Sequence, residues 1–442
     1  MIVICEPQCK GMSHEKVNSG FIYGLRTAFP QEKILFYADE THLEGIKYIL
    51  KNDGVRIDNM EYIPIQLHDP YSFRGMISNY NLLKNLYQDV VSAGTDKIFF
   101  LSTNPVLLYL MKLLKTNPRF RGVKCTIVCH GEFEDIAFGE YREPPVAVFP
   151  AELSMERIRS MSLAERIRRI RSMSPGEIIQ KITRVLRYRY LTGVARIKEI
   201  YPGLFKRYFY VKKFILWRHT SDFHYIVLSP AALRNAAEYI DIKNLNFYGV
   251  VMPIVFAKPL PPPSNEHVKF AVFGYGDSSM TYRTARLLEQ KNIKNPYEIR
   301  VISMDCRGTE GFPAVHCVSS GKVMTRSEME SHVPDIDIFM ILYEKNRYRL
   351  SCSNSILEAI SYIKPVLYIS NDSINYFNSP ENPIGFCCAD LEEAAEKMAD
   401  IINNFSSHKG VLQTYRENIL SLRDQISIEK LAPTIKSSFT FD

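Results

Sequence analysis

The sequence lacks the features that would anchor or export a polypeptide. No apolar run approaches the roughly 18 residues that a membrane-spanning helix needs, so we expect no helix that crosses a bilayer. The opening residues, MIVICEPQCKG, enter an apolar strand at once, without the basic region and long apolar core of a signal peptide. We therefore expect a protein of the reducing cytoplasm.

Cysteine is present, but without an informative spacing. The nine cysteines do not follow the rhythm of a disulfide-rich module, and Cys5/Cys9 and Cys125/Cys129 are spaced more widely than the cysteine pairs of zinc knuckles. From this pattern we expect no disulfide framework, no metal site and no cofactor.

The composition excludes disordered and collagen-like chains. Hydrophobic residues make up 46% of the 442 residues and charged residues 23%, which is ordinary for a globular protein. The length exceeds that of a typical single domain, so two domains with separate cores are expected.

Positive charge is concentrated in one segment. Arg157 to Arg218 contains 17 Lys and Arg against three acids, a local charge of +14 in a chain whose total is +7. The rest of the chain therefore carries a charge of −7. This distribution favours a localised anionic partner.

Short apolar runs alternate with segments of helical length. The first series is IVIC, KILFYA, MEYIPI, DKIFFL and CTIVCH, and it resumes with HYIVLSP and LNFYGVVMPI. A second series, KFAVFGYG, YEIRVIS, AVHCV, IDIFMILY and KPVLYIS, follows a proline-rich linker, Lys258 to Ser264. Helical patterns are clearest at Val17–Ala28, Val106–Lys115, Leu391–Phe405 and Val411–Asp424. Such alternation predicts βαβ units in parallel sheets.

We therefore predict an α/β protein of two Rossmann-like domains that face a central cleft. The first domain comprises residues 1–150 and 219–260, interrupted by a basic helical insert at 151–218, and the second comprises 261–410. Residues 411–442 are predicted to be helical and could cross back to the first domain. Ligands of such sheets bind beyond the carboxyl ends of the strands.

A loop rich in serine and asparagine lies within YRLSCSNSILEAISYIKPVLYIS, Tyr348 to Ser370. It enters a predicted helix whose first backbone N–H groups suit a diphosphate. Ser353, Asn354 and Ser355 could add donors there, and Glu358 would lie one turn further, near a ribose whose hydroxyls it could accept.

Here the sequence resembles the GT-B glycosyltransferases, especially family 4-like enzymes. Their second domain carries a run of the type PS…E…G…LLEAMACGKPVI, and this chain has LSCSNSILEAISYIKPVLYI in the same order. The resemblance implies that Glu358 matches the ribose-binding glutamate of the family. The family's E-x7-E pattern would also require an acid at position 350, where this chain has Leu350. The donor sugar and the stereochemical outcome therefore stay open.

The resemblance extends to other segments of the second domain. KFAVFGYGDSSMTYR looks like the strand and glycine turn that open this domain, which implies that Gly274 and Gly276 let the backbone approach the diphosphate and that Arg283 binds it. A bare tight turn is an equally good interpretation of these glycines. The loop Ser319–Val323 would lie near the base. The acids of DID, Asp335–Asp337, are interpreted as a strand edge rather than a metal-binding D-x-D.

In the first domain, the resemblance places acceptor contacts in CKGMSHEKVNSGFIYGL, where Asn18 and Ser19 lie at the start of a helix. TIVCHGEFEDI ends a strand with His130, which matches a family position near the donor sugar. An inverting transferase needs a base that takes the acceptor's proton, so His130, Glu132 and Asp135 are the candidate catalytic residues. Alternatively, His130 is structural and both acids are solvated loop residues.

The basic insert contains RIRSMSLAERIRRIRSMSPGE, Arg157 to Glu177, which repeats six letters. Each repeat carries an S-x-x-E capping box, Ser162 with Glu165 and Ser174 with Glu177. The insert is therefore predicted to start two consecutive amphipathic helices, with arginines flanking their apolar stripes.

Cationic and aromatic side chains interleave through the insert, among them Arg166, Arg169, Lys212, Lys213 and Trp217. This composition suits an anionic membrane surface or a lipid-linked acceptor. Two alternatives stay open: the apolar stripes pack on the first domain and leave the arginines solvated, or the insert binds nucleic acid. No zinc-finger spacing or RNA-recognition motif favours nucleic acid.

These observations predict a metal-independent glycosyltransferase that moves a sugar from a nucleotide-sugar donor to a saccharide acceptor. The acceptor would be polyprenol-linked or membrane-proximal, as in cell-surface polysaccharide synthesis, and the enzyme would associate peripherally with the inner face of the membrane. The alternatives are a non-catalytic GT-B-like binding protein and a nucleic-acid-binding factor.

Overall fold

The computed structural model describes residues 1–137 and 210–441, with short gaps at 12, 53–54, 56–57, 72, 275–277, 304–305, 307, 310 and 320–323. The description below concerns the unit formed by Met1–Gly139 and Val211–Asp442. Both predicted capping boxes of the insert, Arg166, Arg169 and Gly276 lie outside the described residues.

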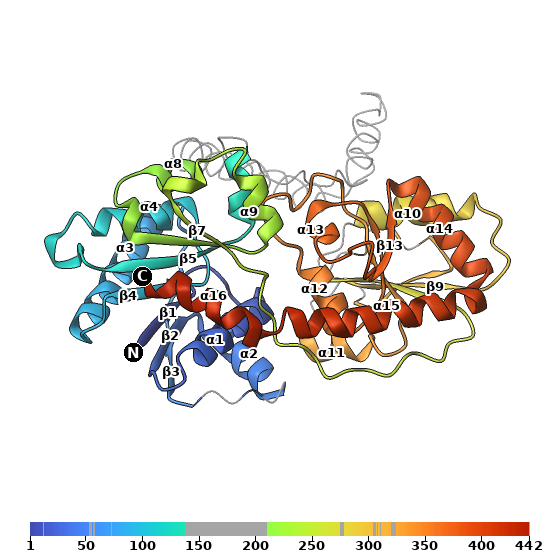
Figure 1. The fold of residues 1–442 in the computed structure, drawn as a ribbon, viewed down its shortest axis with the longest axis horizontal. Coiled ribbons are helices and arrows are strands. Elements are labelled where there is room, and N and C mark those ends of the chain that lie inside the picture. Colours follow the sequence, from blue (N-terminus) through green and yellow to red (C-terminus); the bar gives the residue numbers. More distant parts are fainter. Residues whose placement is uncertain are drawn as a thin grey trace, which may run out of the picture. The chain divides into compact units, whose positions relative to one another are not determined.

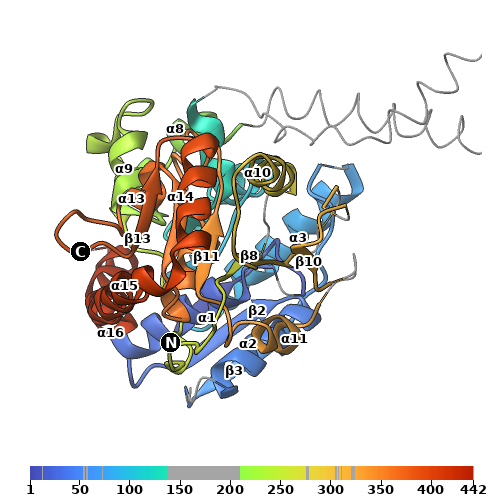
Figure 2. The same ribbon diagram turned by 90° about the vertical axis from the view of Figure 1, so that its right-hand side faces the viewer.

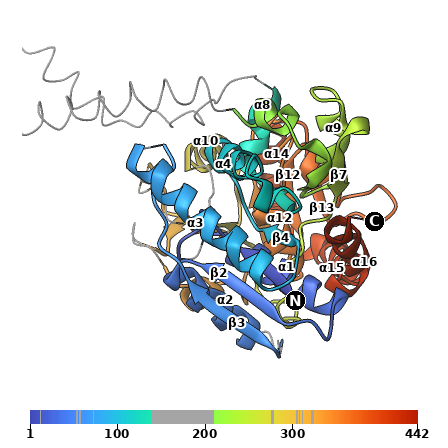
Figure 3. The ribbon, with the colours of Figure 1, turned by 90° about the vertical axis from the view of Figure 1, so that its left-hand side faces the viewer.

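The first lobe, which faces the viewer in Figure 3, is built on a parallel seven-stranded sheet. Its strand order is β3-β2-β1-β4-β5-β6-β7. Its central strands are apolar and buried, as expected for a sheet covered on both faces. The strand order reverses between β1 and β4, which makes the carboxyl ends of these two strands the switch point of the sheet. The strands are β1 (Ile2–Cys5), β2 (Ile34–Ala38), β3 (Met60–Pro64), β4 (Lys97–Phe100), β5 (Lys124–Cys129), β6 (Phe223–Val227) and β7 (Asn246–Gly249).

Helices connect the strands of the first lobe. Asn104 and Ser229 cap the helices that follow them, and each of these helices begins with proline, whose fixed φ suits the first helical position. The helices are α1 (Glu15–Ala28), α2 (Glu40–Asn52), α3 (Phe73–Ser92), α4 (Pro105–Leu114), α8 (Val211–Leu216) and α9 (Pro230–Ala236), with 3-10 turns η1 (Pro118–Phe120), η2 (Gly131–Ala137), η3 (Thr220–Asp222) and η4 (Ile242–Asn244).

The second lobe contains a parallel six-stranded sheet of order β10-β9-β8-β11-β12-β13, with its switch point between β8 and β11. Helix α14 packs on β12 and β13 and beside α10 (Figure 2). The strands are β8 (Lys269–Phe273), β9 (Glu298–Ile302), β10 (Val315–Cys317), β11 (Ile338–Ile341), β12 (Val366–Ile369) and β13 (Gly385–Cys388). The helices are α10 (Ser278–Glu289), α11 (Arg326–Ser331), α12 (Asn354–Ser361), α13 (Asp372–Asn375) and α14 (Leu391–Asn403).

The chain ends in two helices, α15 (Phe405–Gln425) and α16 (Ile428–Thr440), drawn in red in Figure 1. Although α16 follows the second lobe in sequence, it packs on α1 of the first. The Ser438 carbonyl accepts hydrogen bonds from Thr126 Oγ1 at 2.7 Å and from His224 Nδ1 at 2.8 Å. Gly24 permits the close approach, because a Cβ there would lie 2.6 Å from Ile435 Cδ1.

The α/β class with two parallel sheets is as predicted from the sequence. Every apolar run that we expected to form a strand contains one, whereas β13 and the long α3 were not predicted. Residues 251–265, which include the proline-rich linker, contain no helix or strand. Across the described helices, none combines the length and apolar character that crossing a membrane requires.

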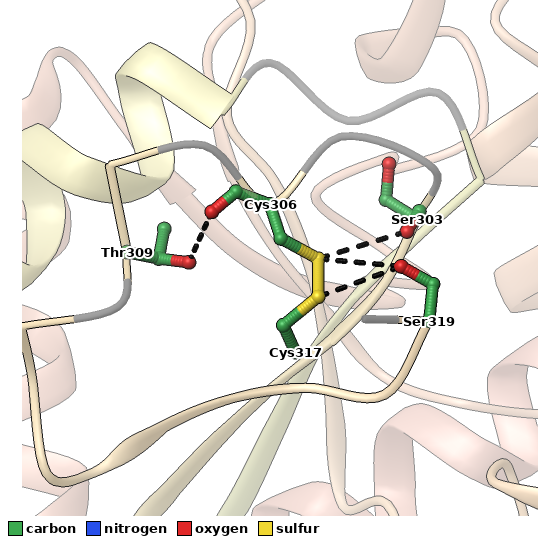
Figure 4. The surroundings of a disulfide bond; sticks show 5 residues. All are labelled: Ser303, Cys306, Thr309, Cys317 and Ser319. Atoms are coloured by element: carbon green, nitrogen blue, oxygen red, sulfur yellow. Dashed lines mark hydrogen bonds between the residues drawn. A yellow bond between two sulfur atoms is a disulfide. The ribbon is translucent and has the colours of Figure 1, made fainter. Parts of the chain in front are cut away.

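One pair of cysteines departs from the expectation drawn from spacing. Cys306 and Cys317, which follow and end neighbouring strands β9 and β10, form a disulfide (Figure 4). The Ser319 hydroxyl lies 3.5 Å and 3.4 Å from the two sulfur atoms, and Thr309 Oγ1 donates to the Cys306 carbonyl at 2.7 Å. The pair could not be recognised from spacing because parallel pairing of β9 with β10 brings it together.

Candidate functional site

The amino end of α12 forms the centre of the candidate donor site. Ser353 is its N-cap, and its side chain accepts a hydrogen bond from the Ser355 backbone N–H at 3.2 Å. A chain of hydroxyl bonds then runs from Ser353 to Tyr343 at 3.1 Å, from Tyr343 to Ser355 at 2.9 Å, and from Ser355 to the Phe273 carbonyl at 3.1 Å. The two serines predicted from the sequence are therefore held in fixed orientations at the end of β8.

A small pocket lies beside this turn. It is lined by the carboxyl-end residues of β8 and β11, by Thr281 in the first turn of α10, and by Tyr343 and Ser355. Gly274 follows β8 with φ +83°, in the left-handed region that favours glycine, and a Cβ there would lie 3.7 Å from Ser355 Oγ. Gly274 thus lies next to the turn of α12, and its approach to a diphosphate stays a prediction.

The structure does not bring Arg283 to this pocket. Successive helical residues are about 100° apart, so Arg283 projects roughly 200° around α10 from the pocket-lining Thr281. Its side chain is exposed, and its guanidinium lies 3.7 Å from Met280 Sδ. The direction of Arg283 depends on the helical phase of α10 relative to the pocket, which the sequence alone does not fix.

Arg347 lies against the pocket wall, and Arg326 also lies 5.6 Å from the ring centroid of the lining residue Phe273. The guanidinium carbon of Arg347 is 5.3 Å from the ring centroid of Tyr343, which lines the pocket, and 5.4 Å from that of Tyr348. Tyr348 has φ 61°, a left-handed conformation that is uncommon for a bulky residue and turns the loop here. Sequence analysis missed Arg347, although the basic run NRYR directly before the serine-rich loop could have indicated it.

Glu358 is buried and engaged by two cations. Its Oε2 accepts from Lys16 Nζ at 3.1 Å and from Arg326 Nη2 at 2.6 Å, while Asn354 Nδ2 donates to Oε1 at 3.3 Å. Despite burial, Arg326 and Lys16 lower the pKa of Glu358 to about 2, so the carboxyl is ionised at neutral pH. The glutamate that we predicted to bind a ribose is therefore already ionised, and it lies about one turn after the start of α12.

The cations beside Glu358 come from both lobes. Lys16 lies in the first turn of α1, and burial lowers its pKa although Glu358 opposes that shift. Arg326 begins α11, where Thr325 and Glu328 form a capping box, and its Nε donates to Glu330 at 2.9 Å. Neither cation was predicted, because their meeting depends on contacts far apart in sequence.

His130 directly follows Cys129, the last residue of β5, and stacks against a second histidine. The rings of His14 and His130 have centroids 4.3 Å apart, and burial lowers the pKa of both. The Nε2 of His130 meets the Leu101 carbonyl at 2.7 Å, so this nitrogen carries the proton of the neutral ring. His14 was not predicted, although it lies in the loop that was expected to contact the acceptor.

Glu132 and Asp135 follow His130 in η2. Burial, reinforced by Asp135 and Glu6, raises the pKa of Glu132 to about 7. A carboxyl with such a pKa can accept a proton near neutral pH, as a general base must. Both acids are partly or fully buried, which argues against the interpretation that they are solvated loop residues.

Asn18 and Ser19 are buried at the start of α1. Asn18 Nδ2 donates to Glu6 Oε2 at 2.9 Å and lies 2.9 Å from His42 Nε2, and Glu6 also accepts from backbone N–H groups of the loop after β1. Within the described part of the chain, Asn18 Oδ1 and Ser19 Oγ have no hydrogen-bonding partner. Asn18 thus holds the β1–α1 loop together with Glu6 and His42. Glu6 and His42 were not predicted from the sequence.

Three of the predicted acceptor or membrane residues lie on or just after α8. The Trp217 ring stacks on Tyr109 at 5.4 Å between centroids, and its carbonyl accepts from Lys112 Nζ at 2.6 Å. Lys212 is half-buried and Lys213 is exposed. Trp217 is therefore packed on the first lobe, whereas both lysines keep contact with solvent.

The DID acids lie at the strand edge, as predicted. Asp335 Oδ1 accepts from Arg300 Nη1, and Asp335 Oδ2 accepts from Lys269 Nζ, both at 2.6 Å. Despite partial burial, these cations lower the pKa of Asp335 to about 2. Asp337 accepts from the backbone N–H of Lys269 at 2.9 Å. Among the residues that the structure describes, no group of His, Cys, Asp and Glu side chains could hold a metal ion.

Comparison with solved structures identifies the fold. The chain resembles a glycosyltransferase from Rickettsia africae (TM-score 0.55, 10% identity, covering 98% of this chain and 96% of that one). It also resembles Anabaena HepE in complex with UDP-glucose (TM-score 0.54, 10% identity, 98% and 97%) and the lipopolysaccharide outer core galactosyltransferase WaaB (TM-score 0.51, 11% identity, 99% and 98%). No family model and no curated protein sequence matches the chain. The protein has the GT-B fold, as predicted, while the likeness to family 4 stays a prediction.

Proposed function

We propose that this protein is a glycosyltransferase that moves a sugar from a nucleotide-sugar donor to an acceptor. The observation that carries the proposal is the ionised, buried Glu358 beside the serine-capped amino end of α12, in a GT-B fold. The amino end of a helix binds a diphosphate favourably. A carboxylate one turn along the helix can accept hydrogen bonds from ribose hydroxyls.

In this proposal, the second lobe stabilises the leaving diphosphate. The first backbone N–H groups of α12 supply neutral donors, the hydroxyl chain through Ser353, Tyr343 and Ser355 holds this turn in place, and Arg347 supplies a positive charge from the pocket wall. Donors that are fixed before the reaction stabilise the developing charge without reorganisation. Because the HepE structure contains UDP-glucose, UDP is the first nucleotide to test.

The first lobe would bind the acceptor and take its proton. Glu132 is the proposed base, since its pKa of about 7 allows it to be ionised at neutral pH and to hold a proton afterwards. We propose that no metal is required, because a diphosphate at α12 meets backbone donors and Arg347 instead.

The acceptor is proposed to be a saccharide, lipid-linked or membrane-proximal, in cell-surface polysaccharide synthesis. The basic insert supports a peripheral site at the inner face of an anionic membrane, and the WaaB likeness is to a protein that acts on lipopolysaccharide. Flotation with anionic liposomes tests this: Arg166→Gln with Arg169→Gln should reduce flotation. Substitution of Lys243→Gln, outside the insert, is the control and should change nothing. Equal flotation of all variants contradicts the membrane proposal.

The nucleotide site is tested by calorimetric titration of UDP, GDP, ADP and CMP. We expect one diphosphate to bind and Glu358→Gln to weaken it, because the amide is a poorer acceptor for ribose hydroxyls. As that variant leaves two cations buried without their anion, Ser355→Ala serves as a second, milder variant. No binding by any nucleotide contradicts the proposal, and binding without sugar transfer would instead favour a binding protein.

A further inference from the structure

Three acids share the η2 turn that follows β5, and their side chains lead in different directions. A 3-10 helix has about three residues per turn, so Glu132 and Asp135 lie on one face and Glu134 on another. Glu134 Oε1 accepts hydrogen bonds from the backbone N–H of Leu350 at 2.9 Å and from the Ser351 hydroxyl at 2.7 Å. The turn with the two candidate catalytic acids is therefore attached to the second lobe through its third acid.

The segment that receives Glu134 leads directly into the donor-binding turn. Leu350 is 0% and Ser351 is 4% exposed, and Ser353, the N-cap of α12, follows two residues later. A shift of this segment would move the Ser353 and Ser355 hydroxyls and the first N–H groups of α12. One carboxylate thus connects the positions of the acceptor-side acids and the donor-side turn.

The preceding residue, Arg349, also contacts the first lobe. Its carbonyl accepts from Asn235 Nδ2 at 2.9 Å, and its guanidinium pairs with Glu238 at 2.6 Å. In that ion pair the side chains are 36% and 53% exposed, so it contributes little. Glu238 is therefore a matched control: it is an acid that contacts the same segment without the buried hydrogen bonds of Glu134.

We propose that Glu134 is a positioning residue that holds the η2 acids of the first lobe in register with the phosphate-binding turn of α12. The inference rests on the proposed function. One carboxyl oxygen of Glu134 accepts from a backbone and a side-chain donor at once, so both bonds are lost when that side chain is removed. Group transfer depends on alignment, and a displacement of about 1 Å can cost roughly a hundredfold in rate.

The variants Glu134→Ala, Glu134→Gln and Glu238→Gln separate positioning from donor binding. We expect Glu134→Ala to lower kcat roughly tenfold to a hundredfold while the dissociation constant of the nucleotide changes by less than about twofold. Glu134→Gln keeps an acceptor oxygen and should recover most of kcat. Glu238→Gln should match the wild-type chain in both measurements.

Hydrogen–deuterium exchange gives a readout that needs no activity. Because the Leu350 N–H donates to Glu134, its exchange should be faster in Glu134→Ala, intermediate in Glu134→Gln and unchanged in Glu238→Gln. Thermal unfolding of each variant establishes that it is folded.

Several outcomes would overturn the inference. Unchanged kcat or unchanged Leu350 exchange in Glu134→Ala would do so, as would a loss of nucleotide affinity equal to the loss of kcat. If the wild-type chain transfers no sugar, the proposed function fails. In that case, faster exchange of the Leu350 N–H in Glu134→Ala would still show that Glu134 attaches η2 to the segment before α12. Unchanged exchange would show that it does not.

Discussion

At the scale of single residues, two arginines near the donor pocket differ in their orientation. Arg283 is exposed and directed away from the pocket, whereas Arg347 lies over the ring of Tyr343 in its wall. Arg347→Gln should weaken binding of a nucleoside diphosphate about tenfold, because a hydrogen bond to a charged group is lost. Arg283→Gln is the control, with little change expected in calorimetry. The reverse order of effects would restore the assignment made from sequence.

The raised pKa of Glu132 predicts how the rate of sugar transfer depends on pH. As a base it must be ionised, so the transfer rate should rise as the pH increases through about 7, and Glu132→Gln should abolish this rise. The exposed acid Glu44 on α2 provides a control, since Glu44→Gln should leave the profile unchanged. A wild-type rate that is flat between pH 6 and 8 would contradict the assignment.

The same carboxyl also predicts a change in stability with a definite sign. Its pKa is raised from 4.5 to about 7 in the folded protein, so the folded state binds the proton more tightly. The stability from this group is complete below the unfolded pKa and is lost as the pH rises through about 7. Denaturation should therefore find Glu132→Gln more stable than the wild-type chain at pH 8 and similar to it at pH 5.

At the scale of elements, the disulfide between the segments after β9 and β10 makes its own prediction. The bond closes a loop with a sequence separation of 11, and its loss should lower the free energy of unfolding by roughly 2–3 kcal/mol. Urea denaturation with and without reductant measures this, and Cys306→Ser should behave as the reduced protein does. Cys387→Ser, at an exposed free thiol, is the control. Equal stability with and without reductant would contradict the prediction.

Element prediction from sequence succeeded where local pattern decides structure. Buried parallel strands are continuous apolar runs, and this is why β1, β5 and β11 could be located by inspection. β13 was missed because Gly385 and two cysteines, GFCC, give no β-branched run, and its strand pairing with β12 is a tertiary effect. The α12 start was found because Ser353 caps the helix from within the local sequence.

The position of the candidate site was predictable only within single segments. Glu358, Ser353 and Ser355 could be placed together from the sequence, since all three lie at one helix start, and their role in binding a nucleotide stays a prediction. Lys16 could not be placed there, because its contact with Glu358 spans 342 residues and depends on how α1 meets α12. The direction of Arg283 was likewise beyond the sequence, as it follows from the helical phase of α10 relative to the pocket.

At the scale of the whole molecule, α16 makes the two lobes depend on one another. It follows α15 in sequence but packs on α1, where Ile435 and Phe439 are buried. Arg416 and Arg423 of α15 donate to the carbonyls of Leu260 and Ala257 in the segment that joins the lobes. The described lobes should therefore unfold together rather than one at a time.

Calorimetry tests this coupling. The wild-type chain should show one main transition for the two lobes. Ile435→Ala should lower the free energy of unfolding by about 2–4 kcal/mol, because it leaves a cavity where α16 packs on α1. Because α16 then packs less tightly on the first lobe, this lobe should melt before the second, and the single transition should split into two. Leu420→Ala is the matched control, since Leu420 is 43% exposed on α15 and its truncation leaves no buried cavity. Two separate transitions in the wild-type chain, or a split by the control variant as well, would show that α16 does not couple the lobes.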